Sequence, residues 1–218
     1  MNPQKPAMNP LIWVGVGLTV VLLLLAFFLS NLLIFTGRGK SLPVYGQVAD
    51  FALTNQNGQV VSLGSLRGRV WVADVIFTRC AGPCLKMSRQ MKELQQVLPQ
   101  RSQVKLVTLT TDPDFDTPPV LKTYAQRFGA EGNRWEFLTG TKKALTELEV
   151  GSLKLTAIEK KPEERETPAD LFIHSTIFVI IDKKGQLRGI FETSGDGIEP
   201  TEIREQILDA TKRLEREG

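Results

Sequence analysis

An uncharged apolar run near the amino terminus constrains this chain more than any other feature. Residues 11–35 read LIWVGVGLTVVLLLLAFFLSNLLIF and contain no acidic or basic side chain. About 20 apolar residues cross the roughly 30 Å hydrocarbon core of a bilayer. A cleaved signal peptide has a shorter apolar region of roughly 7–15 residues and a small-x-small cleavage site, and residues 30–35 (SNLLIF) offer no such site. We therefore predict a transmembrane signal anchor over 11–35, preceded by a short tail over 1–10.

The charges that flank this segment do not determine which way it crosses the membrane. Lys5 lies on one side and Arg38 and Lys40 lie on the other, so the positive charge that marks the cytoplasmic side is nearly balanced. The tail carries no Arg, unlike a mitochondrial transit peptide. This composition favours a bacterial cytoplasmic membrane.

Composition excludes several classes of protein. Two Cys and one His are too few for a tetrahedral zinc site of these ligands or for a disulfide-stapled scaffold, and a Ser–His–Asp hydrolase would have to use His174. Of the 27 basic and 24 acidic residues, three basic and no acidic ones lie in residues 1–44, which leaves the rest of the chain neutral. We expect no nucleic-acid partner, because a neutral domain has no overall attraction for phosphates.

After a tether over 36–47, residues 48–218 are predicted to form one α/β domain. Two alternating segments around residues 55–58 (NQNG) indicate a β-hairpin, and residues 69–77 (RVWVADVIF) indicate a buried strand. The later elements are expected as a helix over 80–97, a strand over 104–110, a helix over 118–128 with Thr117 as its N-cap, a strand over 135–138, a helix over 141–150, strands over 172–181 and 186–191, and a helix over 200–217. Residues 159–168 are charged and are interpreted as an exposed insertion. This order predicts a thioredoxin-like fold with the N-terminal hairpin as an extension.

Both cysteines lie where the predicted buried strand gives way to a helix, in Cys80-Ala81-Gly82-Pro83-Cys84. A helix N-terminus and the neighbouring Arg79 should lower a thiol pKa there. If the helix begins at Cys80, the i, i+4 spacing puts both sulfurs on one helical face. Such a pair can close a disulfide or hold one soft metal ion. The alternatives are two core cysteines or a structural disulfide, which in so short a loop would contribute only about 2 kcal/mol.

His174 is the only imidazole in the chain. Taken alone, a histidine beside an apolar strand is more often a core or edge residue than a ligand. In a thioredoxin-like fold, however, the loop before this strand lies beside the redox cysteines, so we interpret His174 as a third ligand. Two thiolates and one imidazole suit Cu(I), and an added oxygen ligand would allow Cu(II), whereas zinc would need a fourth ligand.

Several short segments between residues 45 and 195 form a recognisable set. They are Asp50-Phe51-x-Leu53, Arg67-Gly68-Arg69-Val70, Phe77-Thr78-x-Cys80-x-x-x-Cys84, Thr111-Asp112-Pro113-x-x-Asp116-Thr117-Pro118, Leu138-Thr139-Gly140-Thr141, and His174-Ser175 before a strand that ends in Asp182-x-x-Gly185. Together with the N-terminal anchor, this set resembles the Sco/SenC family.

The resemblance implies a membrane-tethered thioredoxin-like domain on the periplasmic side that binds copper through Cys80, Cys84 and His174. It implies that the chain delivers copper to, or reduces the cysteines of, the CuA-bearing subunit of cytochrome c oxidase. Our first hypothesis is accordingly a copper metallochaperone rather than a turnover enzyme.

The chain departs from the family pattern around the cysteines, at Arg79, at the three residues between Cys80 and Cys84, and at Leu85. None of these departures removes a ligand. Gly82-Pro83-Cys84 is similar to the Gly-Pro-Cys of thioredoxin. The second hypothesis is therefore a membrane-anchored thiol–disulfide oxidoreductase that uses Cys80 and Cys84, and a redox or copper sensor would use the same residues.

Asp74 lies six residues before Cys80, within the predicted buried strand. Thioredoxins carry an acid at the same offset, so Asp74 is a candidate proton acceptor for Cys84. The alternatives are an Asp at the exposed end of the strand or one paired with a buried Lys.

Two weaker patterns have simpler interpretations. Asp112, Asp114 and Asp116 have the spacing of a calcium loop, but Thr117 stands where that loop requires Gly, so we reject calcium. We interpret Asp112 and Asp116 as turn and cap residues near the cysteines. Met87 is interpreted as a core residue rather than an outer copper ligand.

Overall fold

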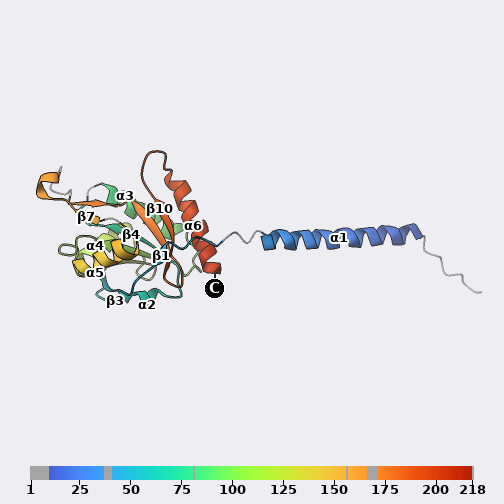
Figure 1. Ribbon diagram of the computed structural model, residues 1–218, viewed down its shortest axis with the longest axis horizontal. Helices are drawn as coiled ribbons and strands as arrows, with labels where there is room; N and C mark the ends of the chain where they lie inside the picture. Colours follow the sequence, from blue (N-terminus) through green and yellow to red (C-terminus); the bar gives the residue numbers. More distant parts are fainter. Residues whose placement is uncertain (1–9, 37–40, 81, 156, 166–170, 218) are drawn as a thin grey trace, which may run out of the picture. The chain divides into compact units, whose positions relative to one another are not determined.

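In the computed structural model (Figure 1), the amino-terminal apolar run forms α1 (Pro10–Thr36). The structure describes residues 10–36, 41–80, 82–155, 157–165 and 171–217. The chain divides into two compact units, Met1–Ser41 and Leu42–Gly218, which are described separately. Within α1, Ile12–Ser30 has a mean hydropathy of 2.7, so its length and composition would allow it to cross a membrane. A signal sequence would have the same properties.

The second unit is built on an eight-stranded mixed sheet with the order β1-β10-β9-β4-β5-β6-β2-β3. At its centre, β4 (Trp71–Ile76) runs parallel to β5 (Lys105–Thr110) and antiparallel to β9 (Ile177–Ile181), and β5 runs parallel to β6 (Trp135–Thr139). The remaining strands are β1 (Gly46–Gln47), β2 (Ala52–Asn55), β3 (Val60–Ser62) and β10 (Gln186–Glu192).

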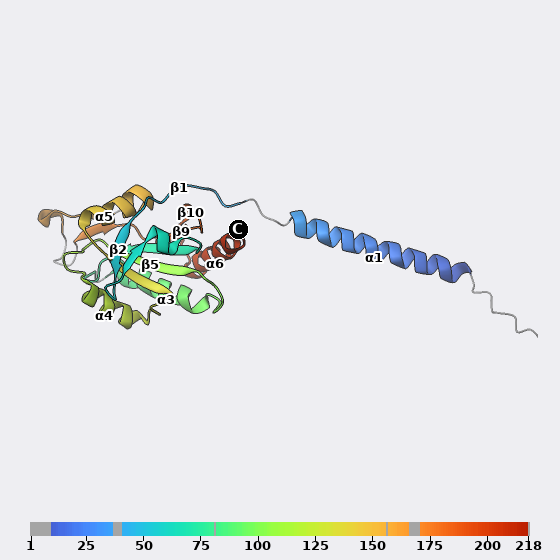
Figure 2. The same ribbon diagram turned by 90° about the horizontal axis from the view of Figure 1, so that it is seen from below.

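Helices cover both faces of this sheet, and every residue of β4 is therefore buried. Val72 and Ile76 pack under α3 (Pro83–Val97), α4 (Pro118–Phe128) and α6 (Pro200–Arg216). The alternate residues Ala73 and Val75 pack under α2 (Leu63–Leu66), α5 (Lys142–Thr146) and a π-helical turn (Glu147–Ser152). Figure 2 shows α5 on one side of the sheet and α3 and α4 on the other.

The structure confirms the predicted order of elements, including the hairpin formed by β2 and β3. The prediction of one strand over 172–181 is wrong. Its first part is β8 (Phe172–His174), which pairs with β7 (Ala157–Glu159) in a separate two-stranded ribbon, and β9 begins only at Ile177. A run of apolar residues cannot show where a strand leaves one sheet for another.

Three further differences concern the ends of elements. The predicted helix over 80–97 begins at Pro83, which suits the first helical position because Pro lacks the N–H that would stay unbonded there. The helix over 141–150 ends as the π-helical turn. Strand β1 lies inside the range 36–47 that the sequence assigns to a tether, and it pairs with β10.

In the insertion over 159–168, Lys161, Glu163 and Glu164 are exposed as expected, and residues 166–168 lie outside the described part.

Arg188 joins the start of the second unit to its end. This buried side chain donates hydrogen bonds to the Leu42 carbonyl at 2.7 Å and the Asp182 carboxylate at 2.7 Å, and it pairs with Glu217 at 2.9 Å. Removing one member of a buried ion pair is strongly destabilising. A truncated chain that began at residue 45 would lose the hydrogen bond between Arg188 and the Leu42 carbonyl.

Glu149 is a buried acid within the π-helical turn. Its side chain is 2% exposed, and its Oε1 atom has no hydrogen-bond partner among the described residues. Burial raises the pKa of Glu149 to about 8. The carboxyl group is therefore held in its neutral form near neutral pH.

We predict that Glu149→Gln makes the free energy of unfolding less dependent on pH. The pKa of Glu149 rises from an ordinary 4.5 to about 8 in the folded chain. The stability that this group contributes is complete below its unfolded pKa and is lost as the pH rises through about 8. Urea unfolding at about pH 5, 7 and 9 should show the wild type losing a few kcal/mol that the variant does not lose.

The control is Glu147→Gln, in the same turn, because the Glu147 side chain is 68% exposed. This variant should keep the pH dependence of the wild type. An equal loss of stability in Glu149→Gln and the wild type would contradict the prediction.

Candidate functional site

The two cysteines lie together at the carboxyl end of β4. Cys80 is in the loop that follows the strand, where its N–H donates to the Phe77 carbonyl at 3.2 Å, and it is 8% exposed. Cys84 is in the first turn of α3 and is fully buried. Both are free thiols, and their side chains are within hydrogen-bonding contact. The two sulfurs would share one helical face only if the helix began at Cys80. Because α3 begins at Pro83, the loop before the helix brings the sulfurs together instead.

The pKa of Cys84 is raised, which contradicts the expectation of a lowered thiol pKa at this position. Burial is the largest cause, followed by the hydrogen bond with Cys80, the charge of Cys80 and, last, the charge of Asp74. A hydrogen bond from the Phe77 backbone acts in the opposite direction. The Cys84 thiol therefore keeps its proton until a metal ion or a disulfide replaces it.

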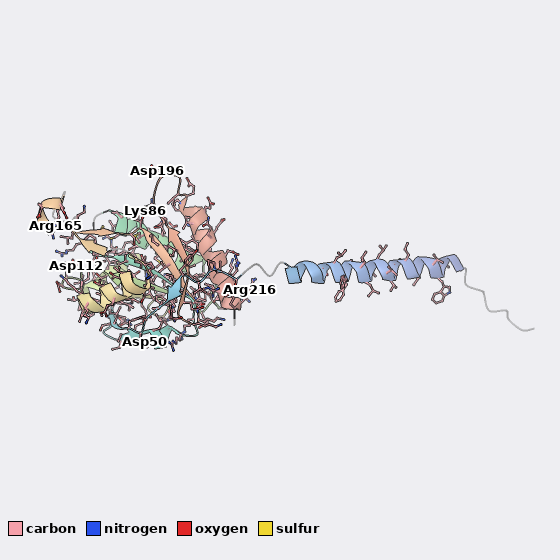
Figure 3. All side chains as sticks on the ribbon, viewed as in Figure 1. Asp50, Lys86, Asp112, Arg165, Asp196 and Arg216 are labelled. Atoms are coloured by element: carbon pink, nitrogen blue, oxygen red, sulfur yellow. The ribbon has the colours of Figure 1, made fainter. Side chains whose placement is uncertain are left out.

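Arg79 does not serve as an isolated cation for the thiols. Its Nη2 atom lies 2.5 Å from the Asp112 carboxylate, and its guanidinium lies 4.3 Å from the centre of the Phe115 ring. The charge that the sequence places beside Cys80 is thus paired with an acid from the segment after β5. Figure 3 labels Asp112 in this segment and Lys86 in the first turn of α3.

Asp116 ties the loop before Cys80 to the end of β5. This fully buried carboxylate accepts hydrogen bonds from the Thr78 N–H at 3.0 Å, from the Thr78 hydroxyl and from the Thr110 hydroxyl. Burial raises the pKa of Asp116, and the bonds from Thr110 and Thr78 oppose this shift. The interpretation that Asp112 and Asp116 shape a loop near the cysteines is confirmed, but neither residue caps α4, whose N-cap is Thr117.

Asp74 lies in the middle of β4 and is fully buried, so the alternative of an exposed strand end is wrong. The Thr108 hydroxyl donates to its Oδ1 atom at 2.6 Å, and the Trp135 indole N–H donates to that hydroxyl at 2.9 Å. Asp74 acts on the pKa of Cys84 through its charge, so the two groups lie within electrostatic range. Its role as a proton acceptor stays a prediction.

A second buried polar pair lies close to the thiols and was not predicted. Ser88 and Tyr124 share a hydrogen bond of 2.9 Å, and both are buried. Burial raises the pKa of Tyr124, and the charges of Cys84, Asp74 and Cys80 add to this shift, whereas the bond with Ser88 opposes it. One signal was available in the sequence, because Ser88 stands one helical turn after Cys84. Met87 is 1% exposed in the hydrophobic core, as predicted.

The backbone of His174 ends β8, where it pairs with Ala157. Because β9 is antiparallel to β4, its first residue, Ile177, lies toward the end of β4 that leads to Cys80. The chain segment of His174 thus reaches the same end of the sheet as the cysteines. The His174 side chain lies outside the described part, and the described side chains include no group of three His, Cys, Asp or Glu placed to hold a metal. Its role as a ligand stays a prediction.

A dithiol at the turn between a central parallel strand and a helix, in a mixed sheet covered on both faces, defines a thioredoxin-like domain. Comparison with known proteins then gives the family. The SCO1/SenC family pattern matches residues 43–211, so the chain belongs to that family.

Individual relatives agree with this assignment. The SCO1 protein homolog of Bacillus subtilis is 36% identical over 162 residues, which cover 72% of this chain and 81% of the relative. The solved structure of BsSco, described as a Sco-family cytochrome c oxidase assembly protein with a disulfide switch, is 27% identical with a TM-score of 0.66 and covers 81% of this chain and 99% of that one. Bradyrhizobium japonicum ScoI, solved with copper bound, shares the fold at 21% identity and a TM-score of 0.61, covering 75% of this chain and 99% of that one.

We predict that Asp116→Ala loosens the cysteine loop. The substitution leaves the Thr78 N–H and the Thr110 hydroxyl without their acceptor, which should cost about 2–4 kcal/mol in the free energy of unfolding. Cys80 should also react faster with a thiol reagent, because the loop that covers it loses its anchor. Both effects can be measured by urea unfolding and by the rate of alkylation.

Asp114→Ala is the matched control. Asp114 is 76% exposed and pairs only at the surface with Lys142, so its loss should cost less than about 1 kcal/mol. The same stability and alkylation rate in Asp116→Ala as in the wild type would show that this carboxylate does not hold the loop.

Proposed function

We propose that this protein is a membrane-anchored copper-binding protein that carries copper on Cys80, Cys84 and His174. It delivers copper to, or otherwise matures, the CuA-bearing subunit of cytochrome c oxidase. The observation that carries the proposal is the pair of buried free thiols, in mutual contact at the end of β4, in a chain of the SCO1/SenC family.

The two sulfurs fit a soft metal ion. Thiolate and imidazole ligands suit Cu(I), and exclusion of water around Cys84 protects such a site. Binding releases the thiol protons, and because the pKa of Cys84 is raised, copper affinity should increase with pH. Cys80 is the more exposed of the two, so an incoming ligand from a partner protein would replace Cys80 first.

Two further observations support the proposal. ScoI, which shares the fold, holds copper, and BsSco is described as a cytochrome c oxidase assembly protein. Helix α1 has the length and composition of a membrane anchor. We place the anchor in the bacterial cytoplasmic membrane and the copper site on its extracytoplasmic side, where the oxidase would be met.

We predict that the reduced full-length chain in neutral detergent binds one Cu(I), measured by competition with a colorimetric Cu(I) chelator. Cys80→Ser or Cys84→Ser should abolish tight binding, and His174→Ala should weaken it by at least about tenfold, because a ligand is lost. Controls are Ser175→Ala, which follows His174 in the sequence, and Met87→Leu, in the core, which should both bind as the wild type does. Unchanged affinity in His174→Ala would refute the proposed ligand set.

The alternative is a membrane-anchored thiol–disulfide oxidoreductase. Two observations favour this alternative. The two thiols are in contact with each other, and a disulfide switch is described for BsSco. The Cys80 thiolate would attack a partner disulfide and release one partner thiol, giving a mixed disulfide. Cys84 would then attack the Cys80 sulfur, releasing the second partner thiol. The partner gains two electrons and two protons, and Cys80 and Cys84 become a disulfide. The accessible Cys80 is the attacking residue because Cys84 is fully buried.

For this alternative, we predict that Asp74→Asn slows disulfide exchange at least about tenfold and shifts its pH profile, because Asp74 accepts the Cys84 proton. Asn keeps an oxygen for the hydrogen bond from Thr108. The rate of reduction of a CuA-domain disulfide between about pH 6 and 9 provides the measurement. Asp114→Asn is the exposed control. An unchanged pH profile in Asp74→Asn would exclude Asp74 as the proton acceptor. Disulfide exchange that persists in His174→Ala would separate exchange from copper binding.

A further inference from the structure

A polar cavity lies at the end of the sheet that does not carry the cysteines. Its volume is about 740 Å³. Its basic lining residues are Arg69 before β4, Lys105 at the start of β5 and Arg134 before β6. These three strands are parallel, so the cavity lies at their amino ends, whereas Cys80 follows the carboxyl end of β4. The cavity is therefore separate from the candidate copper site.

Arg69 and Arg134 lie close enough to Lys105 for their charges to repel its ammonium group. Burial lowers the pKa of Lys105, and the charges of Arg69 and Arg134 lower it further, while Glu136 acts in the opposite direction. Among the residues that line the cavity, three are basic and one, Glu131, is acidic. Glu215, outside this lining, accepts hydrogen bonds from the Ser102 hydroxyl and the Gln103 N–H, both at 2.9 Å. The excess of positive charge therefore lies within the lining itself, around Lys105.

Hydrogen bonds fix most of the lining in position. The Arg134 guanidinium donates to the carbonyls of Pro99 at 3.3 Å and Gln100 at 3.2 Å, and the Lys105 ammonium donates to the Asn133 carbonyl. The Gln95 amide bridges the Gly129 carbonyl at 3.0 Å and the Glu131 N–H at 2.9 Å. The walls are therefore formed before any ligand arrives.

Arg69 is different. Its side chain lines the cavity, but within the described ranges its guanidinium has no hydrogen-bond or ion-pair partner. A guanidinium group presents five N–H donors in a planar fork that matches the oxygens of phosphate. An anion beside Arg69 would also relieve the repulsion that acts on Lys105.

We propose that this cavity binds a phosphate group carried on a small polar molecule, with Arg69 as the donor of direct hydrogen bonds and Lys105 and Arg134 as supporting charges. A volume of about 740 Å³ exceeds what a single inorganic anion fills, and the neutral polar side chains Gln95, Ser102 and Asn133 suit the rest of a polar molecule. A soluble phosphate ester and the headgroup of a phospholipid both carry this chemistry.

Isothermal titration of the full chain in neutral detergent tests the proposal. The probes are inorganic phosphate, glycerol 3-phosphate and glycerophosphoglycerol, the deacylated form of phosphatidylglycerol, each at constant ionic strength. Arg69→Gln should weaken binding at least about tenfold, because a charge-assisted hydrogen bond is lost. Preference for glycerol 3-phosphate would support a soluble ester, and preference for glycerophosphoglycerol would support a lipid headgroup.

The matched control is Arg67→Gln. Arg67 is two residues away, its side chain is 58% exposed, and it pairs at 3.9 Å with Asp50 outside the cavity. Its loss should change affinity less than about twofold. Nuclear magnetic resonance of the Lys105 side chain gives a second readout, because its pKa should rise when an anion binds.

Several results would overturn the proposal. They are no binding of any of the three probes, equal weakening by Arg67→Gln and Arg69→Gln, and a Lys105 pKa that does not respond to the probe that binds. Phosphate binding should be the same in Cys80→Ser as in the wild type, so this test is independent of the copper proposal.

Discussion

Complete burial of β4 is the constraint on which the candidate site depends. Because both faces of the strand are covered, the chain that leaves its carboxyl end has a fixed position, and the buried Asp116 carboxylate holds Thr78 there from the neighbouring loop. Cys80 and Cys84 are placed by this turn rather than by a continuous helix. The burial that fixes their geometry also keeps water from Cys84, so the same packing sets the position of the dithiol and the protonation of Cys84.

This environment differs from that of a thiol activated by a nearby cation. Arg79 is paired with Asp112, and burial raises the pKa of Cys84. A buried thiol that keeps its proton, as Cys84 does, can lose that proton in two ways, since a soft cation can replace it or oxidation can join the two sulfurs. The proposed copper carriage and disulfide exchange would therefore be two uses of one pair of sulfurs, and the imidazole of His174 is the group that would distinguish them.

Much of this molecule could be predicted from local patterns in the sequence. The buried strand β4, the order of later elements and the loop role of Asp116 follow from periodicity, turn residues and motif spacing. Thiol acidity could not be predicted, because it depends on how deeply α3 packs and on whether Arg79 has a partner. The separate pairing of β7 with β8 was missed for a similar reason, since the apolar residues 172–181 read as one strand. The cavity at Arg69 joins residues that are far apart in the sequence, so no local pattern indicates it.

X-ray absorption spectroscopy at the copper edge, on the full chain loaded with Cu(I), tests the proposed copper site most directly. We predict a metal ion bound by two sulfur atoms and one imidazole nitrogen. In His174→Ala the imidazole signal should disappear while both sulfurs remain. A wild-type spectrum with sulfur ligands alone, or one that does not change when His174 is replaced, would contradict the claim that these three side chains meet at one copper ion.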